Sequence, residues 1–142
     1  NGLLDISRVP APFSEQLAAS AVATAEKIAT ALDYVGVLAI ELFVAGDTVL
    51  FNEMAPRVHN SGHWTIEGAV TSQFENHVRA ICGLPLGATD PLGRVEMRNL
   101  IGEDANHWQT LLADPTLHVH LYGKREARPG RKMGHTTRVV RD

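Results

Sequence analysis

The chain has 142 residues, of which 44% are hydrophobic and 20% are charged, which is typical of a globular domain with its own core rather than of a disordered segment. The formal net charge of −3 gives no general attraction for nucleic acid or anionic lipid, and no run approaches the roughly 18 apolar residues of a membrane-spanning helix. The single cysteine, Cys82, excludes an internal disulfide and a cysteine-based metal cage. We expect a cytoplasmic protein. The first residue is not Met, and residues 139–142 stop in what reads as a strand, which indicates a fragment of a longer protein.

The first predicted element is a helix from Ser14 to about Asp33. Ser14 suits the N-cap position, and apolar residues recur behind it every three or four positions. The resulting face is narrow and rich in alanine, so it suits close packing on a sheet. Its members are Leu17, Ala21, Ala25, Ile28 and Leu32.

A β-hairpin is predicted next. Residues 37–44 are apolar on both faces except at Glu41, which reads as a buried strand whose one charge needs a partner. Residues 45–47 form a turn, and residues 48–54 return as a second strand that carries Glu53.

The pairing across this hairpin decides whether the two carboxylates lie together. A three-residue turn pairs Val44 with Thr48 and puts Glu41 and Glu53 on one face as diagonal neighbours. A two-residue turn puts them on opposite faces. We expect the shared face, because two strands that are each interrupted by one glutamate suit a ligand bound by both.

A second helix is predicted from Ser72 to Cys82. Ser72 and Glu75 match a capping box, and Gly83 followed by Pro85 closes the helix. We expect its buried stripe to consist of Phe74, Val78 and Ile81.

Beyond residue 88 the sequence changes to short strands, which places a domain boundary there and divides the chain into residues 1–87 and 88–142. His118 and His120 alternate with two apolar residues, so both imidazoles are expected on the solvated face of a strand. The elements expected in this region are strands at 95–100, 118–122 and 135–140, and a short helix at about 104–113.

The segment 52–65 is the richest in chemically active groups. It has no regular apolar face after Met54, so it must leave the strand and turn. It is either an ordinary solvated loop or a site placed just past a strand end. Arg57, His59 and Asn60 offer a cation, a titratable donor and a neutral amide, a set that can hold a small oxyanion such as carbonate or phosphate.

The glutamate pair is open to three interpretations. Glu41 and Glu53 could hold a magnesium ion that bridges phosphate oxygens, or could act as acid and base in glycoside cleavage. Glu53 could instead pair with Arg57, which the spacing alone slightly favours. His59 and His63 are four residues apart, but the Asn-Ser-Gly between them opposes the regular helix that a zinc site of this spacing needs.

Five of the 13 basic residues lie between positions 124 and 132. They could form a solvated charged loop. Alternatively, the Pro129–Gly130 turn could focus several cations on one point, which suits a phosphate monoester. Nucleic acid would require a wider basic surface with exposed aromatic residues. The five are Lys124, Arg125, Arg128, Arg131 and Lys132.

Several of these motifs, in this order and spacing, closely resemble the 5-(carboxyamino)imidazole ribonucleotide synthase family of purine biosynthesis, within the ATP-grasp superfamily. The related formate-dependent glycinamide ribonucleotide transformylases have Asp-Thr-Gly where this chain has Asn60-Ser61-Gly62. The resemblance implies an α+β fold: the C-terminal part of an ATP-grasp domain, an antiparallel sheet with packed helices, followed by a small β-rich domain. The segments that carry it are 36–43, 52–65, 72–75, 120–124 and 128–135.

The resemblance also implies an activity. In such enzymes ATP phosphorylates bicarbonate, and the resulting carboxyphosphate carboxylates the amine of aminoimidazole ribonucleotide. It makes Glu41 and Glu53 the magnesium ligands and puts Asn52 with Glu53 in the ATP site. Family members are commonly dimers, and the isolated chain is expected to be inactive.

The remaining implied roles concern the other two substrates. Arg57, His59 and Asn60 resemble the bicarbonate and carboxyphosphate pocket, where His59 could also move the amine proton. The basic segment resembles the ribonucleotide site, through Lys124, Arg131 and Lys132. The alternatives are another ATP-grasp ligase, such as the formate-dependent transformylase, or a nucleotide-binding module without catalysis.

Overall fold

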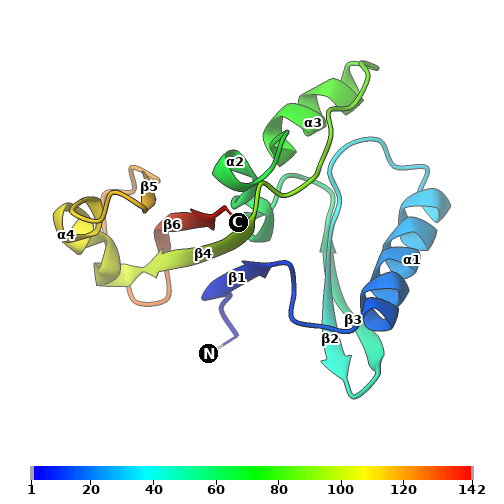
Figure 1. The fold of residues 1–142 in the computed structure, drawn as a ribbon, viewed down its shortest axis with the longest axis horizontal. Helices are drawn as coiled ribbons and strands as arrows, with labels where there is room; N and C mark the ends of the chain where they lie inside the picture. The colour runs from blue at the N-terminus through cyan, green and yellow to red at the C-terminus, as the bar shows by residue number, and fades with distance from the viewer. Residues whose placement is uncertain (1, 142) are drawn as a thin grey trace.

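The computed structural model describes residues 2–141 and consists of two antiparallel sheets with helices beside them (Figure 1). Within these residues no helix is both long and apolar enough to cross a membrane. In chain order the elements are β1 (Ile6–Val9), α1 (Glu15–Ala31), β2 (Ala39–Ala45), β3 (Thr48–Ala55), the 3-10 turn η1 (Asn60–Gly62), α2 (Thr65–Gly68), α3 (Gln73–Ile81), β4 (Arg94–Ile101), the 3-10 turn η2 (Gly102–His107), α4 (Trp108–Leu112), β5 (His118–Leu121) and β6 (Lys132–Val140).

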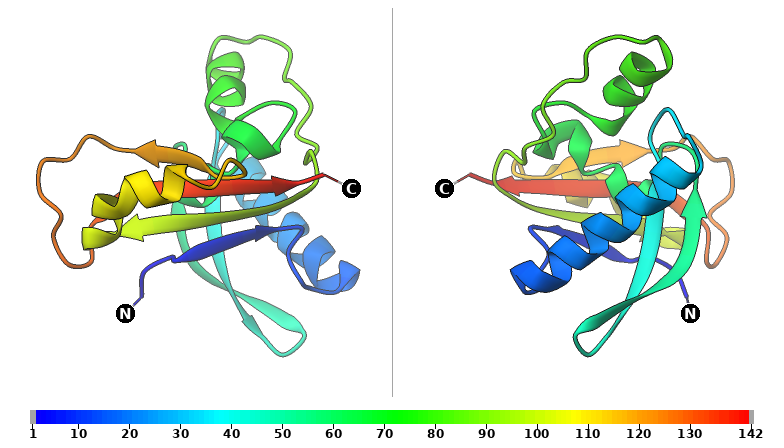
Figure 2. Two further views of the ribbon diagram at one scale, coloured as in Figure 1. Left: turned by 60° about the vertical axis from the view of Figure 1, so that its left-hand side comes forward. Right: turned by 90° about the vertical axis from the view of Figure 1, so that its right-hand side faces the viewer.

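The first helix forms as its sequence pattern predicts. The Ser14 hydroxyl caps α1 by accepting a hydrogen bond from the Leu17 N–H. The helix lies along the hairpin and contacts β3 (Figure 2), and its residue Leu17 is buried. Leu32, expected in the packed stripe, is 50% exposed because the helix ends before it and Leu32 forms the C-cap.

The hairpin pairing differs from the expected one. The turn has two residues and Thr48 pairs with the residue after Val44, so the predicted Val44–Thr48 pairing is wrong. The register then shifts after Glu41, where a β-bulge leaves Asn52 as an extra residue on β3. One extra residue reverses the parity, so Glu41 lies directly opposite Glu53 and the shared face is confirmed.

The second sheet has the strand order β1-β4-β6-β5, with every neighbouring pair antiparallel. Along β4 the buried side chains alternate, so Val95, Met97 and Asn99 share the inner face. Strand β1 joins a sheet whose other strands all follow residue 88, and the domain boundary near that residue stays a prediction.

Helix α3 buries a different face from the expected one. Ser72 caps it by accepting from the Glu75 N–H, but the Glu75 carboxylate pairs with Arg79 instead of completing a capping box. The buried residues are Gln73 and Asn76. The predicted stripe is exposed because no element of residues 2–141 covers it: Phe74 is 38%, Val78 55% and Ile81 58% exposed.

Candidate functional site

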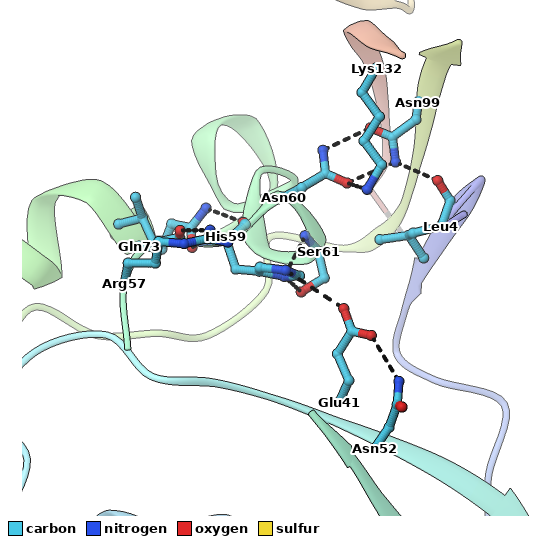
Figure 3. Close-up of polar contacts among 11 residues, drawn as sticks. Leu4, Glu41, Asn52, Arg57, His59, Asn60, Ser61, Gln73, Asn99 and Lys132 are labelled. Carbon is cyan, nitrogen blue, oxygen red and sulfur yellow. Dashed lines mark hydrogen bonds and ion pairs between the residues drawn. The ribbon is translucent and has the colours of Figure 1, made fainter. Parts of the chain in front are cut away.

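The two glutamates and one histidine meet at the open end of the hairpin. Ligand atoms of Glu41, Glu53 and His59 all lie within 4.8 Å of one another. The His59 Nε2 is 3.6 Å from the Glu41 Oε1, and the Asn52 Nδ2 donates to the Glu41 Oε2 at 3.4 Å (Figure 3). The bulge therefore serves the site twice, because it aligns the carboxylates and turns Asn52 towards one of them.

His59 is set up as a hydrogen-bond donor on the side that faces Glu41. Its Nδ1 accepts from the backbone N–H of Ser61 at 3.3 Å and lies 2.9 Å from the Ser61 hydroxyl. A neutral imidazole whose Nδ1 accepts carries its proton on Nε2. The Nε2–H therefore points towards the carboxylates, which suits an anion better than direct bonding to a metal ion.

The donor set fits magnesium. Mg²⁺ prefers oxygen ligands and takes one or two carboxylates from a protein, which the facing pair Glu41 and Glu53 supplies. The alternative ion pair between Glu53 and Arg57 is not formed within the described residues. The Arg57 guanidinium instead donates to the neighbouring Val58 carbonyl at 3.0 Å.

Gln73 holds the turn that carries His59. Its Oε1 accepts from the His59 N–H at 2.9 Å, its Nε2 donates to the His59 carbonyl at 2.8 Å, and the same nitrogen is 2.9 Å from the His63 Nδ1. A Cβ at Gly62 would lie 2.6 Å from the Gln73 Oε1, so a larger residue there would displace the Gln73 amide from these hydrogen bonds. The first residue of α3 thus fixes the polar turn against the rest of the fold.

Asn60 points away from the carboxylates towards the second sheet (Figure 3). It forms a reciprocal amide pair with buried Asn99, at 2.7 Å and 2.9 Å. The Asn60 Oδ1 also accepts from the Lys132 ammonium at 2.9 Å. The Asn99 Nδ2 donates in addition to the Leu4 carbonyl at 2.9 Å, so the pair ties the turn to β4 and to the segment before β1, and Lys132 ties it to β6.

Lys132 links the two halves of the site electrostatically. Partial burial lowers the pKa of its ammonium below the ordinary value of 10.5, and neighbouring Lys124 lowers it further, while the Glu41 carboxylate opposes both effects. The ammonium is therefore affected both by the Glu41 carboxylate and by Lys124 of the basic segment. The structure thus brings Glu41, Glu53 and His59 together and joins Asn60 to Lys132, whereas the Arg57 guanidinium lies against the Val58 carbonyl.

Several cationic side chains of the basic segment, residues 124–132, already contact other groups of the protein. The Arg131 N–H donates to the Arg128 carbonyl at 3.0 Å, which closes the expected turn through Pro129 and Gly130. The Arg128 guanidinium pairs with Glu126, and Arg131 lies 3.4 Å from the Glu126 carbonyl. The Lys124 ammonium, by contrast, donates to the Lys132 carbonyl and lies 5.5 Å from the centre of the Tyr122 ring.

The solvated position predicted for His120 is wrong. Its Nε2 lies 2.6 Å from the Glu67 Oε1, and its ring stacks on His135 with centroids 4.5 Å apart. The reason is that α2 covers this face of β6, and His120 pairs with His135 across the strands. His118, the other histidine of the strand, is exposed as expected.

Several polar residues of the site were not predicted from the sequence. Asn99 gives a signal in retrospect, because it is an amide at an inward position of an alternating strand, where a polar group needs partners. Tyr122, His135 and Gln73 give none, because their roles depend on segments far apart in the chain.

Two protein families match this chain. The ATP-grasp domain family matches residues 1–74, and the phosphoribosylaminoimidazole carboxylase C-terminal domain family matches residues 96–142. The first match covers more than half of the chain. The predicted α+β fold is thereby confirmed.

Individual relatives agree. The N5-carboxyaminoimidazole ribonucleotide synthase of Brucella melitensis is 54% identical over 98% of this chain and 39% of the relative. The crystal structure of the Thermus thermophilus enzyme of that name has a TM-score of 0.90 and 56% identity over 99% of this chain and 39% of that one. An Aspergillus clavatus synthase in complex with ADP and 5-aminoimidazole ribonucleotide has a TM-score of 0.93 and 35% identity over 100% of this chain and 40% of that one. The chain spans about two fifths of the length of these relatives.

Proposed function

The chain belongs to the ATP-grasp family, and from its similarity to N5-carboxyaminoimidazole ribonucleotide synthases we propose that it is the C-terminal part of such an enzyme. The full-length polypeptide would use ATP to phosphorylate bicarbonate and would transfer the activated carboxyl group to the amine of aminoimidazole ribonucleotide, with release of ADP and phosphate. We further propose that it works in the cytoplasm and as a homodimer.

One observation carries this proposal: a carboxylate pair and a cluster of anion-binding donors lie side by side. Glu41 and Glu53 share one face of the hairpin, and His59 is at 3.6 Å from the first of them. Lys132, held by Asn60, lies close enough to Glu41 for the carboxylate to shift its pKa. Transfer of a phosphoryl group between oxygens needs this combination of positioned groups and fixed cations.

Each group has a distinct proposed role. Magnesium bound by Glu41 and Glu53 would neutralise charge on the ATP phosphates, and Asn52 would orient the nearby carboxylate. His59 would donate from Nε2 to the bicarbonate oxygen, and Arg57 would supply a second cation once it leaves the Val58 carbonyl. Lys132 would hold the carboxyl group between the ATP site and the ribonucleotide, and Asn60 would hold the Lys132 ammonium in place for it.

The test is an omission assay on the full-length polypeptide. ADP formation is measured with ATP and magnesium while bicarbonate, aminoimidazole ribonucleotide or formate is added or left out. We expect turnover that requires bicarbonate and rises with the ribonucleotide. Turnover that requires formate instead would assign the chain to the acyl-phosphate ligases, and ATP binding without any turnover would make it a nucleotide-binding module.

A first prediction concerns the basic segment. Lys124→Ala and Arg131→Ala should each raise the Michaelis constant for the ribonucleotide about 10-fold, because each removes one charge-assisted contact to its phosphate. The Michaelis constants for ATP and bicarbonate should stay unchanged. Steady-state kinetics with the three substrates varied in turn provide the measurement.

Arg125→Ala is the matched control for these two variants. Arg125 lies in the same exposed segment but has no proposed contact with substrate, so its effect should remain below about 2-fold. Equal effects of all three substitutions would indicate a general electrostatic attraction, and no effect of any would return the segment to a solvated charged loop.

A further inference from the structure

The amide of Asn60 has a single possible orientation. An asparagine side chain has two N–H donors and one oxygen that accepts two hydrogen bonds. The Asn60 Nδ2 donates to the Asn99 Oδ1 at 2.7 Å and to the Tyr122 hydroxyl at 3.4 Å. Its Oδ1 accepts from the Asn99 Nδ2 and from the Lys132 ammonium, both at 2.9 Å. A flipped amide would set N–H groups against the ammonium and against the Asn99 N–H, and its oxygen against the Asn99 Oδ1, so three of the four contacts would become repulsive.

The Tyr122 hydroxyl can accept from Asn60 only if it donates its own proton to another group. The hydroxyl has one hydrogen, and it already accepts from Asn60, whose Nδ2 can only donate. Its second partner is the His135 Nδ1 at 2.8 Å. His135 is neutral near pH 7, because burial, followed by the nearby His120 and His63, lowers the pKa of its imidazole to about 4. The phenol donates to Nδ1 in the tautomer that carries the proton on Nε2, a buried atom without a hydrogen-bond partner among the described residues.

The His135 ring is itself held in place. It is 1% exposed, and the His120 ring stacks on it with an interplanar angle of 12°. His120 is fixed in turn by Glu67, at 2.6 Å, from α2. A buried aromatic ring with a packed neighbour is held in one position, so its Nδ1 stays beside the phenol.

We propose that Tyr122 and His135 are positioning residues, which fix the Asn60 amide and through it the direction of the Lys132 ammonium. They touch no substrate themselves. The catalytic consequence of this inference rests on the proposed function. In that function the hydrogen-bonded series His135–Tyr122–Asn60 would position the Lys132 ammonium, which would contact the transferred carboxyl group. Its structural part, the restraint on Lys132, stands without that function.

Kinetic measurements on the full-length polypeptide test the catalytic part. Tyr122→Phe and His135→Leu should each lower kcat/KM for bicarbonate about 10-fold. His135→Asn should keep most of the wild-type kcat/KM, because the asparagine amide can place a hydrogen-bonding atom where the His135 Nδ1 lies. In an Asn60→Ala background Tyr122→Phe should cost nothing further. Additive losses, or a loss seen only as a smaller active fraction, would indicate a merely structural role and overturn the inference.

Chemical labelling of lysines tests the restraint without any need for activity. The full-length protein is acetylated with a trace of acetic anhydride, and the labelling of Lys132 is compared by mass spectrometry with that of exposed Lys27 in the same digest. Release of the ammonium from Asn60 exposes it to the reagent, so Tyr122→Phe and His135→Leu should raise the ratio about 3-fold or more.

The controls separate this effect from general loosening. Tyr34→Phe removes the other phenol of the chain, which donates to the Val37 carbonyl at 3.1 Å, and should leave the ratio unchanged, as should His135→Asn. An unchanged ratio in Tyr122→Phe overturns the inference. If the wild type lacks bicarbonate-dependent ADP formation while the ratio rises as expected, the proposed function fails and the restraint on Lys132 is upheld.

Discussion

Glu53→Gln is expected to lower the turnover of ATP by the full-length polypeptide at least about 100-fold, because it removes one of the two carboxylates that would hold the magnesium ion. Glu53 is exposed and lies directly opposite Glu41. The substitution is isosteric and leaves no buried group without a partner, so the thermal unfolding midpoint should hardly change. Turnover is measured as ADP released at saturating ATP across a range of magnesium concentrations.

The magnesium dependence distinguishes loss of a metal ligand from other causes. If Glu53 binds the ion, the variant should need a higher magnesium concentration for its residual activity. Glu26→Gln, on the exposed face of α1, removes the same charge at a distance and should behave as the wild type. ATP turnover by Glu53→Gln within about 3-fold of the wild type would remove the metal role from the hairpin.

Lys132→Met is expected to lower kcat/KM for bicarbonate roughly 100-fold, which is the typical effect of removing one fixed donor from an oxyanion site. Methionine keeps the length of the side chain but supplies neither the charge nor the hydrogen bond to the Asn60 Oδ1. Lys27→Met, on exposed α1, is the matched control and should be silent. A Lys132→Met enzyme with unchanged kcat/KM would exclude this ammonium from the bicarbonate pocket.

The pH dependence of Lys132 gives the same prediction a second test. The charged groups that affect its ammonium are Glu41 from β2, which raises its pKa, and Lys124 from the basic segment, which lowers it. Burial and Lys124 lower the pKa of Lys132. As the pH rises, the ammonium therefore loses its positive charge at a pH below 10.5, the ordinary pKa of a lysine. The profile of kcat/KM should therefore fall on the alkaline side earlier than an ordinary lysine would cause. In Lys132→Arg, whose side chain stays charged, the alkaline fall of kcat/KM should shift to higher pH. An alkaline fall at the same pH in both enzymes would assign it to another group.

Local patterns in the sequence predict the elements of this fold better than their packing. Ser14 and Ser72 mark the starts of α1 and α3 because N-caps are local interactions. The apolar stripe of α3, in contrast, is exposed, since periodicity shows which face is apolar but not whether another element covers it.

The glutamate pair shows how a correct expectation can rest on a wrong register. We expected Glu41 and Glu53 on one face because both were thought to bind the same ligand, and the structure places them on one face. It does so through a two-residue turn and a bulge at Asn52 rather than through a longer turn. A bulge depends on pairing along the whole hairpin and leaves no mark in residue spacing.

The histidines of β5 show a case in which the face of the strand is predicted correctly but its surroundings are not. Alternation predicts correctly that His118 and His120 share a face of the strand. It does not show that α2, with four residues and no periodic signal, covers part of that face and gives His120 a carboxylate partner. The residue types of Arg57, His59 and Asn60 predict an oxyanion site, and the family resemblance alone makes its ligand bicarbonate or carboxyphosphate; both stay predictions until variants are measured.

The most direct test of the central claim uses bicarbonate labelled with oxygen-18. If the site joins bicarbonate to the γ-phosphorus of ATP, the attacking oxygen remains with phosphorus when the carboxyl group is passed to the amine. The full-length polypeptide, assayed with ATP, magnesium and aminoimidazole ribonucleotide before the label exchanges with water, should release phosphate that carries one oxygen-18 per turnover. Phosphate with oxygen derived only from water would contradict the account, because the γ-phosphate would then have been hydrolysed without ever being bound to bicarbonate.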